Sequence, residues 1–140
     1  MSEAANAPQR PLPRADEPDT REFWARTRNQ VLAYQQCDDC GTIVFYPRQH
    51  CTGCLGANLS WKESKGEGSI YTFSVVRQSY HPFFRAKVPY AVAWIDLDEG
   101  PRILSNITGM DDPGKLEVGQ RVTVEWEEHD ELSVPLFKPS

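Results

Sequence analysis

The 140-residue sequence predicts a mainly β protein with a short N-terminal helix, a metal-binding ribbon and a C-terminal barrel of five strands. Two observations support this fold class. All four cysteines lie within eighteen residues, as two pairs with two residues between the cysteines of each pair. From residue 59 onward, short segments of alternating polar and apolar residues are separated by Gly, Pro and Asp, and no long helical pattern appears. The length predicts one domain with a small core.

The chain begins with a proline-rich stretch followed by a helix signal. Residues 1–18 contain four prolines between small and polar residues, a composition that cannot close a core. They predict a flexible arm that stays mobile unless a partner orders it. A helical segment is expected at residues 19–34. Asp19 is its expected N-cap, Glu22 would complete a capping box, and the helix is expected to end near Gln30.

Two adjacent aromatic residues, Phe23 and Trp24, lie in the first turn of this expected helix. A helix this short cannot cover both rings by itself. They can pack on the body of the chain, which is the usual fate of large apolar side chains. They can also form a partner interface, where Trp and Phe are enriched. The sequence leaves both interpretations open, and Phe23 and Trp24 are kept as candidate interface residues.

The cysteines Cys37, Cys40, Cys51 and Cys54 are expected to organise a ribbon over residues 35–58. In a chain without a secretory signal, paired Cys-x2-Cys motifs favour a metal site over disulfide bonds. Each two-residue spacer lets both thiolates of one turn point at the same ion, and two such turns supply a tetrahedral site with four sulfur ligands. We therefore expect a structural zinc ion, which would supply most of the stability of so small a segment.

Two alternatives to structural zinc come from the same residues. A catalytic zinc keeps one position open to water and commonly uses His, but four thiolates would fill the coordination shell. His50 directly precedes Cys51 and suits a surface residue better. Four thiolates also bind iron in electron carriers. The sequence contains no nucleophile motif, phosphate-binding glycine loop or zinc-protease motif, so no catalytic residue is predicted.

Residues 59–140 are expected to form the barrel. Five or so short strands without a long helix favour a small closed or partly closed barrel, for which the OB-fold is the simplest candidate. The last strand is expected to close the barrel as an edge strand. The expected strands are residues 69–76, 90–97, 102–107, 121–128 and 134–137.

The segment 77–89, which joins the first two expected barrel strands, combines aromatic rings with positive charge. Exposed apolar groups at this density are typical of a binding surface, and OB-folds bind ligands through such loops. Cations and aromatic rings suit the phosphates and adenine of a nucleotide-like ligand, and also single-stranded nucleic acid. The alternative is that Phe83 and Phe84 only plug one end of the barrel. The candidate residues are Arg77, Tyr80, His81, Phe83, Phe84, Arg85 and Lys87.

The charge distribution narrows the class of partner. Residues 55–89 carry five basic and two acidic side chains, whereas residues 90–140 carry four basic and eleven acidic ones. The acidic C-terminal third argues against nucleic acid, and the positive segment favours a small phosphorylated ligand or an acidic partner surface. No apolar run approaches the ~20 residues of a membrane span. The first thirty residues show no secretory signal, so a cytoplasmic location is expected.

An ordered set of motifs spans about residues 20–138. It consists of Phe23-Trp24, Leu32, Tyr34, the four cysteines with Gly41, Phe45-Tyr46-Pro47-Arg48, Trp61, Gly66, Gly68, Phe73, Pro89-Tyr90, Gly100, Leu116, Gly119, Val122 and Phe137. Each piece alone is weak, but the set is specific. It resembles a family of rubredoxin-like zinc-ribbon plus OB-fold proteins that accompany thiolase-superfamily enzymes and were long catalogued as a domain of unknown function.

The resemblance implies a non-catalytic accessory subunit. Its partner in a hetero-oligomer would be a thiolase-like aldolase, carbon–carbon lyase or acyltransferase, or an enoyl-CoA hydratase-like chain. The family's zinc ligands correspond to Cys37, Cys40, Cys51 and Cys54, and we place the 77–89 loop at the acyl-CoA entrance of the partner. The resemblance does not specify the acyl group of the substrate. A sterol side chain, as in steroid or other lipid degradation, is one option, and aromatic and short-chain acyl groups are others. A nucleic-acid-binding ribbon–barrel module is the alternative function.

Overall fold

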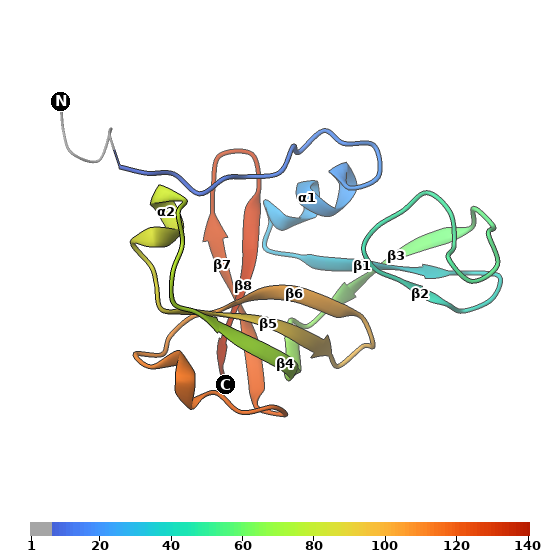
Figure 1. Cartoon of the computed structure of the whole chain (residues 1–140). Helices are drawn as coiled ribbons and strands as arrows, with labels where there is room; N and C mark the ends of the chain where they lie inside the picture. Colours follow the sequence, from blue (N-terminus) through green and yellow to red (C-terminus); the bar gives the residue numbers. More distant parts are fainter. Residues whose placement is uncertain (1–6) are drawn as a thin grey trace.

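The computed structural model describes residues 7–140 and consists of a small ribbon sheet beside a closed barrel, with a short helix packed on the barrel (Figure 1). Residues 1–6, the start of the expected arm, lie outside the described residues. Residues 7–20 contain no helix or strand and pass over one end of the barrel before the first helix (Figure 1). No helix within residues 7–140 has both the length and the apolar character needed to cross a membrane.

Helix α1, Arg21–Thr27, is shorter than the sequence predicts. Its N-cap is Thr20 rather than Asp19, and no side chain donates or accepts a capping hydrogen bond, so the expected capping box is wrong. The helix also does not extend through residues 19–34, because a strand begins at Leu32. Seven residues make only two turns, which are marginal without tertiary packing.

The ribbon is a three-stranded antiparallel sheet in the order β2-β1-β3. Its central strand is β1, Leu32–Cys37, flanked by β2, Ile43–Val44, and by β3, Leu59–Ser64. The sequence analysis placed residues 59 onward in the barrel, but β3 pairs with β1 along its whole length. The ribbon sheet therefore continues past residue 58, and the barrel strands begin at Glu67.

The barrel closes in the order β4-β5-β6-β8-β7, and β7 pairs in turn with β4. The five-stranded barrel that the sequence predicts is confirmed, and its last strand closes it against both β6 and β7. A helical turn lies in each of the two longer loops. The bounds are β4 Glu67–Val76, α2 Pro82–Arg85, β5 Tyr90–Leu97, β6 Arg102–Ile107, η2 Pro113–Lys115, β7 Arg121–Glu128 and β8 Ser133–Pro139.

One hydrophobic core joins the barrel to α1 and to the base of the ribbon. Phe23 of α1 and Leu32 of β1 are buried in the same cluster as the inward residues of the barrel, and Phe45 packs against it. The Thr27 hydroxyl donates to the Trp24 carbonyl at 2.6 Å and accepts from the Ser133 backbone N–H at 3.1 Å. The ribbon and the barrel therefore share a core near the base of the ribbon.

Candidate functional site

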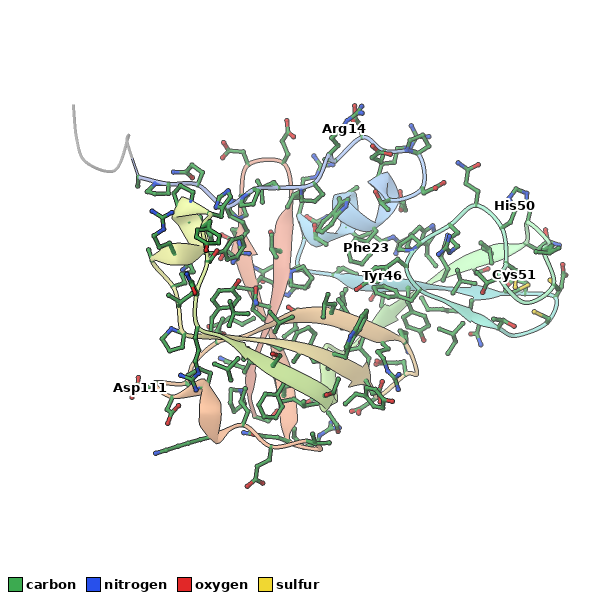
Figure 2. The ribbon with its side chains drawn as sticks, viewed as in Figure 1. Arg14, Phe23, Tyr46, His50, Cys51 and Asp111 are labelled. Atoms are coloured by element: carbon green, nitrogen blue, oxygen red, sulfur yellow. The ribbon has the colours of Figure 1, made fainter. Side chains whose placement is uncertain are left out.

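The four cysteines meet at the tip of the ribbon, as the sequence predicts (Figure 2). Their sulfur atoms all lie within 4.8 Å of one another. The Cys37–Cys54 and Cys40–Cys51 sulfur pairs are 3.6 and 3.5 Å apart. Four sulfurs arranged tetrahedrally at the Zn–S distance of ~2.3 Å would be separated by about 3.8 Å. The site therefore fits zinc with four thiolate ligands.

Each cysteine pair lies in the same kind of backbone turn. The Gly41 N–H donates to the Cys37 carbonyl at 2.9 Å, and the Leu55 N–H donates to the Cys51 carbonyl at 3.0 Å. Both Gly41 and Leu55 have a left-handed backbone, with φ of 77° and 66°. The second turn directs the backbone N–H groups of Gly53 and Cys54 onto the Cys51 sulfur. Such N–H donors stabilise a thiolate, which is the form that binds metal.

Hydrogen bonds in the site shift the pKa values of the thiols in opposite directions. The Thr42 side chain is the main cause that lowers the pKa of Cys40 to about 6. The backbone of Cys54 lowers the pKa of Cys51. The backbone of Gly56 lowers the pKa of Cys54, but contacts with the other three thiols and burial outweigh it and raise that pKa to about 12. A metal ion that binds all four sulfurs must therefore displace the Cys54 proton.

The surroundings of the cluster point to a structural role for the metal. Cys37 and Cys51 are buried with Val44 in a small cluster of their own, separate from the main core. His50 is exposed and does not belong to the group of potential ligands (Figure 2). Zinc bound by four thiolates has no open position for water. Four thiols from two turns can hold the tip of the ribbon together, and that is the chemistry this arrangement supports.

Buried Gln35 positions the insert between the two cysteine pairs. Its side-chain N–H donates to the Arg48 carbonyl at 2.9 Å, and its side-chain oxygen accepts from the Arg48 N–H at 2.8 Å. Because both ends of the buried Gln35 amide are hydrogen-bonded, its burial carries little desolvation penalty, and the two bonds fix the position of Arg48 relative to strand β1. The sequence analysis did not single out Gln35. Strand β1 is buried at nearly every position, and a polar amide next to the apolar residues Leu32, Ala33 and Tyr34 is the signal that could have found it.

The 77–89 loop contains the four-residue helix α2, which begins where the His81 ring nitrogen accepts from the Phe83 N–H at 3.1 Å. The Phe83 and Phe84 rings meet edge to face with centroids 5.0 Å apart, and Phe84 packs against Tyr90 at 5.6 Å. Both phenylalanines are half-buried on the outside of the barrel. They are absent from the barrel core cluster, unlike the plug that the sequence analysis considered.

The remaining candidate residues of the loop are on its surface. Tyr80 is 81% exposed, and His81 and Lys87 are exposed as well. The Arg85 side chain donates to the Tyr80 carbonyl at 2.8 Å, and Arg77 and Arg85 line an open hollow of about 320 Å³. The loop thus presents an aromatic ring beside two guanidinium groups, a combination that suits a phosphorylated or acidic surface.

Phe23 and Trp24, the candidate interface residues, have different surroundings. Phe23 is only 5% exposed and contacts Trp24 and Phe45 edge to face, so its ring packs on the chain itself. Trp24 is half-buried and lines a hollow of about 210 Å³ with Tyr46, Leu104 and Pro135. Figure 2 shows Phe23 under α1 and Tyr46 between the ribbon and the barrel. Within the pair, Trp24 is the side chain that a partner could reach.

The sequence analysis missed Arg10, which packs on the 77–89 loop. Its guanidinium forms a bidentate ion pair with Glu127, at 2.5 and 3.1 Å, and lies over the Phe83 ring at 4.8 Å. Burial raises the pKa of Glu127 most, but hydrogen bonds from Arg10 and His129 outweigh it, and the net effect lowers this pKa. No local pattern marks an arginine in a proline-rich arm for such a contact.

Two family descriptions match successive parts of the chain. Residues 24–60 match the rubredoxin-like zinc ribbon domain of ChsH2, and residues 61–127 match the C-terminal OB-fold domain of ChsH2. The boundary between the two falls within β3. The ribbon match supports the assignment of the four cysteines as the ligands of a structural zinc ion.

Curated relatives and a solved structure agree with this match. The chain is 35% identical over 120 residues to a "Probable enoyl-CoA hydratase alpha subunit" of Thermomonospora curvata, covering 84% of this chain and 37% of the relative. It is 30% identical over 108 residues to the "Benzoylsuccinyl-CoA thiolase subunit BbsA" of Thauera aromatica, covering 73% of each. The chain thus spans little more than a third of the hydratase subunit.

The likeness in structure covers nearly the whole chain. A chain of the "Ltp2-ChsH2(DUF35) aldolase" superposes with a TM-score of 0.80 at 32% identity, covering 91% of this chain and 98% of that one. The order of ribbon and barrel, the four-cysteine site and these matches agree with one another. The chain therefore belongs to the DUF35 family, in which a ChsH2-type zinc ribbon precedes an OB-fold.

Proposed function

We propose that this chain is a non-catalytic accessory subunit of a thiolase-superfamily enzyme, an aldolase, carbon–carbon lyase or acyltransferase that acts on acyl-CoA thioesters. The observation that carries the proposal is the likeness to the chain of the Ltp2-ChsH2(DUF35) aldolase over 91% of this chain. Two relatives, named as a thiolase subunit and a hydratase subunit, also point to acyl-CoA enzymes. The metal site has four protein ligands and no open position, which suits a subunit without chemistry of its own.

The surface that we assign to the partner and its acyl-CoA is the 77–89 loop together with Trp24. The loop offers exposed Tyr80, the guanidinium groups of Arg77 and Arg85, and Lys87. Aromatic and arginine side chains are the residues that most often carry binding energy in interfaces. In a chain of net charge −5, this positive segment suits the phosphates of coenzyme A or an acidic rim of the partner.

The first test is a tagged purification of the full chain from its native host, with mass spectrometry and acyl-CoA assays of what accompanies it. We expect a thiolase-superfamily chain in a fixed ratio to this one, with turnover that depends on both. Recovery of the chain alone, or with RNA as the nucleic-acid-binding alternative requires, would contradict the proposal.

The second test is the substitution Tyr80→Ala. Because Tyr80 is 81% exposed, its loss should leave the barrel folded and weaken the partner complex about tenfold, as for a typical interface aromatic. Tyr71→Ala is the matched control, since Tyr71 is a 51% exposed tyrosine on strand β4, outside the loop. Equal affinities for the two variants in a titration of the purified partner would remove the loop from the interface.

A further inference from the structure

Within residues 7–18, Arg10 makes the hydrogen bonds that join this arm to the barrel. The Arg10 side chain is only 9% exposed, whereas Arg14 on the same arm is 73% exposed and pairs with nearby Asp16 and Glu17. Arg10 lines two hollows. One, of about 210 Å³, also contains Trp24 in its lining, and the other, of about 120 Å³, contains Lys87 and Tyr90. Arg10 thus forms part of the wall that the two hollows share.

The site around Arg10 matches the chemistry of a guanidinium group. The Glu127 carboxylate accepts two N–H groups of the Arg10 guanidinium, and its Oε1 atom also lies 2.7 Å from the His129 Nε2 atom. Phe83 and Phe84 place their rings 4.8 and 5.4 Å from the guanidinium carbon. A planar cation on aromatic faces with a bidentate carboxylate is the arrangement that favours Arg over Lys. We call Glu127, Phe83 and Phe84 the arginine socket.

Helix α2 is too short to be stable without contacts to the rest of the chain. It has only four residues, Pro82–Arg85, and none of them is fully buried. A single helical turn is unstable in isolation. Lys87 over the Phe83 ring and Arg85 on the Tyr80 carbonyl are contacts within the loop. Phe84 on Tyr90 and Arg10 across both phenylalanine rings join the helix to strand β5 and to the arm. Figure 1 shows the arm passing beside α2 and the end of the β7–β8 hairpin.

We propose that Arg10 is a positioning residue: seated in the arginine socket, it orders the 77–89 loop and makes the N-terminal arm part of the surface that the loop presents. The order of the 77–89 loop depends on this chain alone, whereas the effect on partner affinity rests on the proposed function. A loop that is already ordered loses less entropy on binding, so Arg10 strengthens the complex without itself touching the partner.

Hydrogen exchange on the zinc-loaded full chain tests the inference. In Arg10→Ala we expect the hydrogen-bonded amides of Phe83, Arg85 and Lys87 to exchange about tenfold faster, because the loop loses the Arg10 contacts that order it. Arg10→Lys should recover only part of the protection, because Lys cannot form the bidentate pair. Arg14→Ala is the matched control and should exchange like the unaltered chain. Equal exchange in Arg10→Ala and Arg14→Ala would overturn the proposal.

Chemical rescue separates a guanidinium site from a general loss of stability. Ethylguanidinium added to Arg10→Ala should restore protection of residues 81–87 and should not do so in Arg10→Ala combined with Glu127→Ala. Absence of rescue in the single variant would contradict the arginine socket. With purified partner, Arg10→Ala should bind more weakly than Arg14→Ala. Loop disorder with unchanged partner affinity would overturn the consequence for binding, whereas absence of any partner would count against the proposed function alone.

Discussion

At the scale of single residues, the two cysteine turns differ in how well their sequence suits the backbone. Gly41 and Leu55 occupy equivalent positions after the second cysteine of each pair, and both are left-handed. Glycine adopts this conformation freely, whereas a leucine pays about 1–2 kcal/mol. Leu55 is 77% exposed, so burial of its side chain does little to offset this conformational cost. The second turn therefore carries a strain that the first turn avoids.

This difference predicts opposite effects of two substitutions on stability. Gly41→Ala should lower the free energy of unfolding of the zinc-loaded chain by about 1 kcal/mol, through backbone strain alone. A Cβ atom at Gly41 would meet no atom within 4 Å, so a clash is not the cause. Leu55→Asn should raise stability by about 0.5 kcal/mol, because Asn tolerates the left-handed region. Denaturant unfolding checks both values, and a stabilised Gly41→Ala would contradict the argument.

At the scale of elements, the ribbon has two parts with different sources of stability. Its base, with Leu32 and Trp61, packs with the barrel core. Its tip buries only Cys37, Val44 and Cys51, with Leu59 packed against them. So little apolar surface cannot offset the conformational entropy of ordering the two turns. The tip must obtain its stability from the metal, whose binding is worth roughly 10–16 kcal/mol in structural zinc sites.

Removal of the metal should therefore unfold the tip and spare the barrel. In Cys54→Ser, or after chelation, we expect loss of the zinc and rapid hydrogen exchange in residues 37–58, while strands β4 to β8 keep their protection. His50→Ala is the control, because His50 is exposed and adjacent to the site without being a ligand. Metal analysis should give one zinc per chain. A coloured, iron-loaded protein or a zinc-retaining Cys54→Ser variant would refute this.

At the scale of the whole molecule, the base of the ribbon, α1 and the barrel are packed together around one core. Phe23 connects the three, because it lies in the barrel core, belongs to α1 and contacts Phe45 at the base of the ribbon. The β3-to-barrel junction is also bonded: Glu99 accepts from the Ser64 hydroxyl at 2.6 Å and from the Lys65 N–H at 2.9 Å. Modules linked in this way are expected to unfold together.

Phe23→Ala should consequently destabilise the whole chain. Loss of a buried phenylalanine costs about 3–5 kcal/mol, and we expect this loss in a single transition for the barrel and the base of the ribbon. Tyr80→Ala, which removes an aromatic ring that is 81% exposed, should leave that transition unchanged. Thermal unfolding followed by both fluorescence and circular dichroism measures the effect. A Phe23→Ala variant as stable as Tyr80→Ala would show that its ring is not part of the core.

The sequence by itself determined the features that local pattern encodes. Cys-x2-Cys spacing defines the metal turns because both ligands of a pair lie in one turn, and the structure brings all four together. The alternation of β7 defines a strand because every second side chain faces the core, and the short apolar run of β5 is typical of a buried strand. The number of such strands was enough to predict the barrel. The family resemblance rests on the same local motifs, and it is confirmed.

Only the tertiary structure decided which distant segments meet. The alternation in β3 suits either sheet, and its pairing with β1 was settled by packing at the base of the ribbon. Phe23 packs in the core because the barrel offers it a hydrophobic site, which no pattern in α1 reveals. Arg10 and Glu127 meet across 117 positions, and their pairing depends on how the arm crosses the barrel. Long-range contacts of this kind leave no periodic signal in the chain, because they arise only once the fold has formed.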